Sequence, residues 1–181
     1  MKRRSWLLGA AGGAAAATGL AWQRWRETQL QPPLEPAAAV PGSDPGALWA
    51  MSFEQPAGGS LVMASLRGQP LLLNFWATWC PPCVKEMPDL DRFAQRFAAQ
   101  GWRVVGLAVD KPVAVREFLA RTPVSYAIGL AGFEGSELSR QLGNAQAGLP
   151  FTVAFNRQGE VVQRKAGATT LQELSTWAKS A

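Results

Sequence analysis

The 181-residue sequence predicts an α/β fold in which helices cover both faces of a central mixed sheet. Residues 71–76 and 103–109 are largely apolar, as strands are when both faces of a sheet are buried. Apolar side chains recur at helical spacing between them, and a strand, helix and strand in this order make a right-handed parallel unit. Residues 151–155 and 161–163 flank Asn-Arg-Gln-Gly, which predicts a hairpin and adds antiparallel strands.

The first 27 residues predict a targeting segment. Lys2, Arg3 and Arg4 precede an apolar stretch over residues 6–22, as in a secretory signal, and the paired arginines resemble a twin-arginine signal. An uncleaved membrane anchor is the alternative, because the stretch approaches the roughly 20 residues of a spanning helix. Either interpretation places the rest of the chain in the periplasm or on the outer face of a bacterial inner membrane.

Residues 28–47 predict a flexible linker, since five prolines stand there among Ala, Gln and Gly. The folded domain is therefore expected over residues 48–181. Its first strands are expected at residues 48–53 and 61–63, with a two-glycine turn between them.

The helix after the first central strand is expected to begin at Cys80 and to end at Gly101, with a kink at Pro88. Asp110 is expected to cap a second helix over residues 112–120, with a proline in its first turn.

Three further elements are expected in the last third of the chain. They are a short strand over residues 125–130, a small helix over 136–142, and a final helix that Thr170 and Glu173 start with a capping box.

The composition excludes several kinds of function. There is no histidine, which excludes Ser-His-Asp and Cys-His catalysis and any His-ligated metal. Two cysteines cannot complete a four-ligand zinc site without carboxylates. Nearly all of the net charge of +5 belongs to the first 27 residues, so the body of the chain has no signature of a nucleic-acid partner.

Cys80 and Cys83 are the only cysteines, and they stand at the start of a predicted helix. A helix N-terminus stabilises a thiolate, which is the form that attacks disulfides. We expect Cys80 to be the nucleophile, exposed at the helix tip, and Cys83 to resolve the mixed disulfide from a buried position one turn deeper. No cofactor beyond this redox-active disulfide and no metal are expected. An inert disulfide and a Cu(I) site on the two thiolates are the alternatives.

Pro81 and Pro82 lie between the two cysteines, and neither has an N–H group. The Cys80 sulfur therefore loses two backbone donors, which predicts only a moderate lowering of its pKa. A less stabilised thiolate favours a reductant with a potential near that of thioredoxin rather than that of DsbA.

The order of elements resembles the thioredoxin fold, and residues 76–88, WATWCPPCVKEMP, resemble its TlpA/ResA branch of bacterial extracytoplasmic thiol–disulfide oxidoreductases. The resemblance covers residues 48–180. It implies a three-layer thioredoxin-like fold with N-terminal strands and an extra helix and strand, which residues 111–131 match. Members of this branch commonly begin with a signal or a membrane anchor.

The resemblance also implies roles for single residues. Glu86 matches an acidic residue expected to carry protons to or from a buried thiol; from spacing alone, a solvated carboxylate is the alternative. Leu149 and Pro150 match the cis-proline loop that pairs with substrate backbone. Trp79 is expected either to offer an apolar docking face or to pack in the core. Phe151 stands where many relatives carry a small polar residue.

The sequence thus predicts a reductant of protein disulfides that takes electrons from a membrane thiol donor. Trp79, Pro81, Pro82, Leu149 and Pro150 are expected to contact the protein substrate. Cytochrome c maturation is one candidate role, although the acidic residue that such members carry after the cis-proline is absent. A disulfide oxidase or isomerase, and a Cu(I)-handling protein, are the competing functions.

Overall fold

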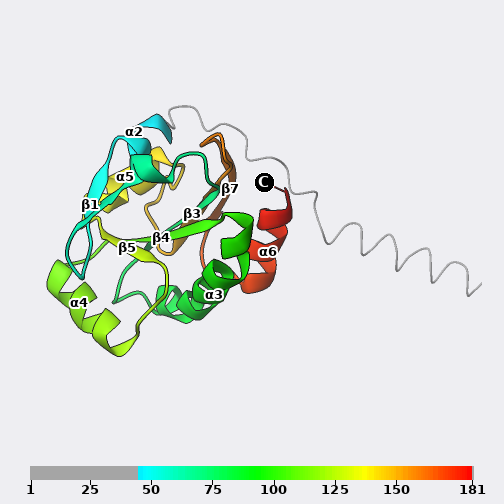
Figure 1. Ribbon diagram of the computed structural model, residues 1–181. Coiled ribbons are helices and arrows are strands. Elements are labelled where there is room, and N and C mark those ends of the chain that lie inside the picture. The colour runs from blue at the N-terminus through cyan, green and yellow to red at the C-terminus, as the bar shows by residue number, and fades with distance from the viewer. Residues whose placement is uncertain (1–44, 181) are drawn as a thin grey trace, which may run out of the picture. The chain divides into compact units, whose positions relative to one another are not determined.

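Seven strands form one mixed sheet in residues 45–180, the part of the chain that this computed structural model describes (Figure 1). The strands are β1 (Ser52–Glu54), β2 (Ser60–Val62), β3 (Leu71–Trp76), β4 (Arg103–Ala108), β5 (Ala127–Leu130), β6 (Phe151–Phe155) and β7 (Val161–Ala166). Their order in the sheet is β2-β1-β5-β4-β3-β6-β7. The predicted targeting segment and residues 28–44 of the predicted linker lie outside the described residues.

Strand β3 is the centre of the sheet, and all six of its residues are buried. It pairs with β4 in parallel and with β6 in antiparallel orientation. Strand β5 extends the parallel side, and β7 pairs with β6 as the predicted hairpin. The carboxyl ends of β3, β4 and β5 therefore meet at one edge of the sheet, where the loop with the cysteines begins.

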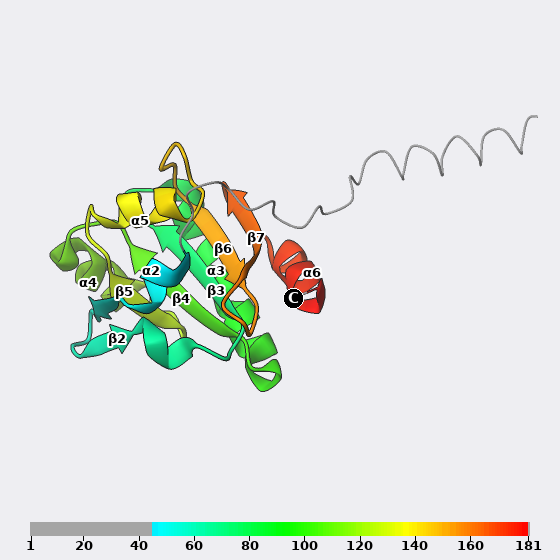
Figure 2. The ribbon, with the colours of Figure 1, turned by 90° about the horizontal axis from the view of Figure 1, so that it is seen from above.

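Helices cover both faces of the sheet, as predicted (Figure 2). One face carries α3 (Pro81–Phe97), α4 (Pro112–Arg121) and α6 (Leu171–Ser180), and the other carries α2 (Pro45–Trp49), the 3₁₀ turn η1 (Met63–Leu66) and α5 (Gly135–Gln141). A second 3₁₀ turn, η2 (Ala98–Gln100), prolongs α3. Within residues 45–180, every helix is too short or too polar to span a membrane.

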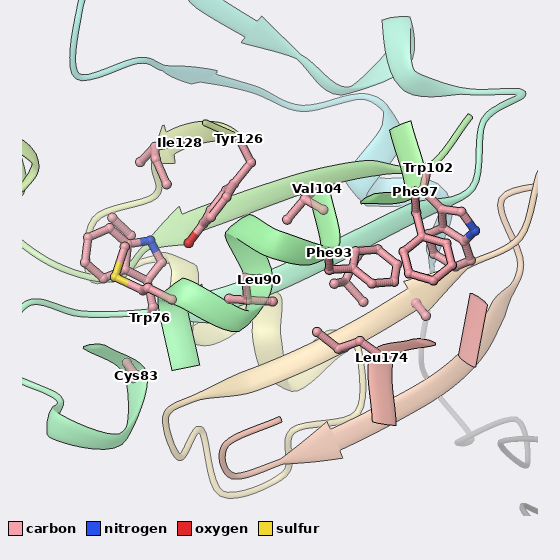
Figure 3. Close-up of a cluster of buried hydrophobic side chains, with 14 of the residues drawn as sticks. Trp76, Cys83, Leu90, Phe93, Phe97, Trp102, Val104, Tyr126, Ile128 and Leu174 are labelled. Carbon is pink, nitrogen blue, oxygen red and sulfur yellow. The ribbon is translucent and has the colours of Figure 1, made fainter. Parts of the chain in front are cut away.

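Helix α3 is held on the sheet by a large apolar cluster (Figure 3). Phe93 stacks on Phe97 with ring centroids 4.6 Å apart and meets the edge of Trp102 at 5.5 Å. Each buried side chain of this size stabilises the fold by about 1.5–3 kcal/mol. These rings hold the C-terminal half of α3 on the sheet, and Cys83, Met87 and Leu90 continue the same buried cluster toward the start of the helix.

The predicted ends of several elements are confirmed. Thr170 and Glu173 form the capping box of α6, in which the Thr170 N–H donates to Glu173 Oε2 and the Glu173 N–H donates to Thr170 Oγ1. Gly101 ends η2 in the left-handed region, with φ of 88°.

Three local predictions differ from the structure. Leu48 and Trp49 belong to α2 rather than to a strand, and Trp49 packs edge-on against Phe155 at 5.5 Å. A helix of five residues is too short to show helical spacing, so its apolar residues are easily assigned to the strand that follows. Residues 45–47, which the sequence assigned to the linker, also belong to α2. Asp110 does not cap α4: the cap position is Lys111, without a side-chain cap bond, and Asp110 binds the loop after β3 instead.

Candidate active site

The loop after β3 delivers Cys80 to the cap position of α3, where its sulfur is bonded to that of Cys83. The Cys83 N–H donates to Cys80 Sγ at 3.3 Å. Pro81 and Pro82 occupy the first two helical positions and have no N–H to offer. The Cys80 sulfur thus has one backbone donor from the first turn of its helix, as the sequence predicted.

Cys80 is less exposed than predicted. Only 4% of its surface is accessible, and Cys83 is fully buried. The expectation of an exposed nucleophile is therefore wrong for the disulfide form, in which the Cys80 sulfur is bonded to buried Cys83 and accepts from the Cys83 N–H. The predicted burial of Cys83 is confirmed.

An apolar rim surrounds the disulfide. Trp79 is 62% exposed, and Pro81 and Pro82 are exposed beside it. Of the two alternatives for Trp79, this exposure favours a docking face over packing in the core. Trp76, by contrast, is fully buried and lies in the cluster of Figure 3.

The bond between Leu149 and Pro150 is cis, as the family resemblance implied. Pro150 directly precedes β6, whose Phe151 pairs with Phe75 of β3, so the cis-proline lies at the edge of the sheet where β3 ends. Pro150 is buried and Leu149 is half-buried. The Gly167 N–H, just after β7, donates to the Pro150 carbonyl at 2.8 Å.

Glu86 is buried one turn beyond Cys83 on α3, with 2% of its surface accessible. Its Oε1 accepts from Asn74 Nδ2 at 2.8 Å, and its Oε2 accepts from the Thr169 N–H at 2.6 Å and from Thr169 Oγ1 at 3.0 Å. Burial raises the pKa of Glu86 above its ordinary value, opposed by these hydrogen bonds and by the charge of Lys165. The solvated carboxylate considered as an alternative is therefore wrong.

The sequence analysis missed the partners of Glu86. Asn74 is fully buried in β3, and its Nδ2 also donates to the buried Thr152 Oγ1 at 3.0 Å. The available signal was a single polar residue inside an otherwise apolar central strand. Thr169 carried no comparable signal, because it stands in a polar loop.

A second missed contact shapes the loop that carries Trp79. Asp110, in the loop after β4, is 5% exposed and accepts from the Thr78 N–H at 3.0 Å and from the Thr78 hydroxyl. It also accepts from the Lys111 N–H at 2.7 Å. These bonds tie the loop before Cys80 to the neighbouring parallel strand.

Metal binding has no further support in residues 45–180, where no three His, Cys, Asp or Glu side chains gather to hold an ion. The Cu(I) alternative therefore rests on the two cysteine sulfurs alone.

Comparison with known proteins agrees with this geometry. ResA, a thiol-disulfide oxidoreductase of Bacillus subtilis, is 32% identical over 121 residues, which are 65% of this chain and 64% of ResA. A thiol:disulfide interchange protein of the thioredoxin family from Chlorobium tepidum is 28% identical, with a TM-score of 0.63 over 72% of this chain and 92% of its own. DsbF from MTB is 26% identical, with the same TM-score over 74% and 96%.

The Redoxin family matches residues 50–178, which is most of the chain. The predicted thioredoxin-like fold and the resemblance to ResA are thus confirmed. The chain belongs to the Redoxin family and is a thiol–disulfide oxidoreductase of the thioredoxin superfamily.

Proposed function

We propose that the protein reduces disulfides of extracytoplasmic protein clients with the dithiol form of Cys80 and Cys83. The observation that carries the direction of transfer is the single backbone N–H on the Cys80 sulfur, with prolines at the next two positions. A thiolate that is weakly stabilised makes the reduced form less stable, so the dithiol gives up its electrons more readily.

The reaction is a pair of exchanges. The Cys80 thiolate attacks one sulfur of the client disulfide, which forms a mixed disulfide and releases the other client sulfur as a thiolate that takes up a proton. Cys83 then loses its proton and attacks the Cys80 sulfur. This step forms the Cys80–Cys83 disulfide and releases the second client thiol. Two electrons have passed to the client, and a membrane thiol donor must supply two more for the next cycle.

Glu86 serves as the proton acceptor for Cys83 in this scheme. It stands one helical turn away on the same helix, and burial raises its pKa above the ordinary value, so the carboxylate takes up a proton more readily than an exposed one.

The client docks on the apolar rim and the cis-proline segment. Exposed Trp79, Pro81 and Pro82 offer apolar surface beside the disulfide, and the backbone at Leu149 and Pro150 offers an edge for an extended client segment. The location outside the cytoplasm is supported by the basic and apolar pattern of the first 27 residues.

The reduction potential tests the direction. We expect a value near that of thioredoxin, about −270 mV, measured against glutathione or a reference thioredoxin. A value near that of DsbA, about −120 mV, would instead make the protein an oxidase or isomerase.

Insulin reduction tests whether the cysteines carry the activity. Cys80→Ala should abolish it, whereas Trp79→Ala should raise KM for insulin and leave the reduction of a small disulfide nearly unchanged. Cys83→Ala should trap clients on Cys80. Their identity then separates apocytochrome c, a copper-site protein and misoxidised proteins in general.

A further inference from the structure

Hydrogen bonds run from Glu86 to both segments that flank the cis-proline. On one side, Asn74 Nδ2 bridges Glu86 Oε1 and Thr152 Oγ1, at 2.8 and 3.0 Å. On the other side, Thr169 donates its N–H and its hydroxyl to Glu86 Oε2. The four side chains are at most 3% exposed, so solvent does not compete for these bonds.

The two sets of hydrogen bonds form two branches of one network, through Asn74 to Thr152 and directly to Thr169. Both branches end close to Pro150 along the chain. Thr152 stands two residues after Pro150 in β6. Thr169 stands two residues after Gly167, whose N–H donates to the Pro150 carbonyl. A change in either branch therefore acts on a segment that holds the cis-proline in place.

The donors and acceptors in this network suit the ionised form of Glu86. A carboxylate accepts all three bonds, but a protonated carboxyl has one oxygen that must donate. The Asn74 Nδ2 group cannot accept, while Asn74 Oδ1 is buried without a hydrogen-bond partner in the described residues. A proton on Oε1 therefore breaks the Asn74 contact or turns the amide, and both outcomes change the bond to Thr152.

Other titratable groups also face Glu86. Lys165 on β7 lowers its pKa, and the Lys165 ammonium is itself paired with Glu173 on α6. Tyr126, just before β5, is buried and feels the charge of Glu86. Cys83 lies one turn earlier on the same helix and carries a proton when reduced. A test must therefore change the network without adding or removing a charge at Glu86 or at any of these groups.

We propose that Asn74, Thr152 and Thr169 are positioning residues that link the proton on Glu86 to the segments that hold Pro150. This inference rests on the proposed function, in which Glu86 takes the proton of Cys83 and the client docks at Pro150. When Glu86 takes the proton of Cys83 in the resolving step, its hydrogen bonds to the segments around Pro150 change. This change comes at the step in which the client must leave.

The test uses Thr152→Val, because Thr152 makes no contact with Glu86 in the network and valine keeps its shape. The Asn74 amide loses the acceptor that fixes its orientation, so its bond to the carboxylate weakens and the Glu86 pKa rises. In the reduced full-length protein, we expect the carbon-13 signal of the Glu86 carboxyl to titrate about half to one pH unit higher. Thr152→Ser should restore the original titration.

Ser139→Ala is the matched control. Ser139 is a fully buried hydroxyl on α5 that likewise accepts from an asparagine amide, that of Asn144, at 3.3 Å. Its removal should leave the Glu86 titration unchanged. Equal shifts in Thr152→Val and Ser139→Ala, or no shift in Thr152→Val, would overturn the proposal. Thr169→Val, which removes one donor from Oε2, should shift the titration in the same direction and provides a second variant should Thr152→Val fail to fold.

The kinetic consequence is measured with insulin over a range of pH. Thr152→Val should move the pH profile of kcat/KM in the wild-type background and leave it unmoved in Glu86→Gln. A profile that moves equally in both backgrounds would show that Thr152 acts without Glu86. The titration does not require activity, so it can still test the network in a protein that reduces no client.

Discussion

Cys80 shows how two residues without an N–H group set the chemistry of a neighbouring sulfur. A side chain at the cap of a helix ordinarily accepts from the second or third helical N–H. Here Pro82 holds the second position, and only the Cys83 N–H at the third reaches the sulfur. The reducing character that we propose therefore depends on one missing donor.

Pro82→Ala should restore this donor. The added N–H stabilises the thiolate, so the Cys80 pKa should fall by about half to one unit and the reduction potential should become more positive. The ultraviolet absorbance of the thiolate, followed over pH, measures the first change, and equilibrium with glutathione measures the second. Pro123→Ala, at an exposed proline before β5, is the control. An unchanged Cys80 pKa would show that the missing N–H does not limit thiolate stability.

Single residues also mark the limit of prediction from sequence. The two cysteines, Glu86 and Pro150 could be found because each belongs to a local motif. Asn74 stands out only as a polar residue in an apolar strand, and its partner Thr152 is 78 positions away. Pairing of β3 with β6 brings Asn74 and Thr152 together, and the register of this pairing cannot be predicted from the sequence of either strand alone.

At the scale of elements, the parallel strands β3 and β4 also position the loop that carries the active site. Asp110, two residues after the end of β4, holds the loop between β3 and α3 through the Thr78 N–H and hydroxyl. Two adjacent carboxyl ends are thus joined just before Trp79 and Cys80. The sequence suggested a helix cap at Asp110 because Pro112 follows, but a cap and a cross-strand tie use the same kind of side chain. Only the neighbouring strand decides between them.

Asp110→Ala should loosen this loop. The half-buried Thr78 N–H loses its bond to the buried Asp110 carboxylate, so the free energy of unfolding should fall by about 1–3 kcal/mol, and insulin reduction should slow because Trp79 and Cys80 are held less firmly. Urea unfolding and the insulin assay measure the two effects.

Asp91→Ala is the control for the Asp110 variant. Asp91 Oδ1 also accepts from a backbone N–H and a hydroxyl, those of Ser125, but at a more exposed position away from the cysteines. It should lower stability less and leave the rate unchanged. Equal slowing in both variants would mean that the tie to Thr78 has no specific role.

Across the whole domain, the sheet separates two apolar clusters, one under α3, α4 and α6 and the other under α2 and α5. The sequence predicted this layered plan because β3 and β4 read as strands buried on both faces. It could not predict α2, since this short helix is defined by packing of Leu48 and Trp49 rather than by its own periodicity. The layered arrangement can thus be predicted from local sequence patterns, whereas the surroundings of the buried Glu86 carboxyl arise from tertiary packing.

The buried Glu86 carboxyl should make the free energy of unfolding depend on pH. Burial raises the pKa of Glu86 above its ordinary value of 4.5, so the folded chain binds this proton more tightly than the unfolded chain. Between the ordinary and the raised value the folded state holds more protons, and the contribution of Glu86 to stability falls as pH rises. Glu173 acts in the opposite direction: burial tends to raise its pKa, but the hydrogen bond and charge of Lys165 and the bonds from Thr170 hold it below 4.5, so its contribution is lost as pH falls.

Glu86→Gln removes the contribution of Glu86 to the pH dependence of stability and leaves that of Glu173. The free energy of unfolding of Glu86→Gln, relative to that of the wild type, should therefore increase as pH rises from 4.5 and should level off above the raised pKa. Urea unfolding of the disulfide forms at a series of pH values measures this difference, and Glu137→Gln, at an exposed carboxylate on α5, is the control. Parallel curves for wild type and Glu86→Gln would mean that the folded chain holds the Glu86 proton no more tightly than the unfolded chain, and the proposed proton transfer from Cys83 would lose its physical basis.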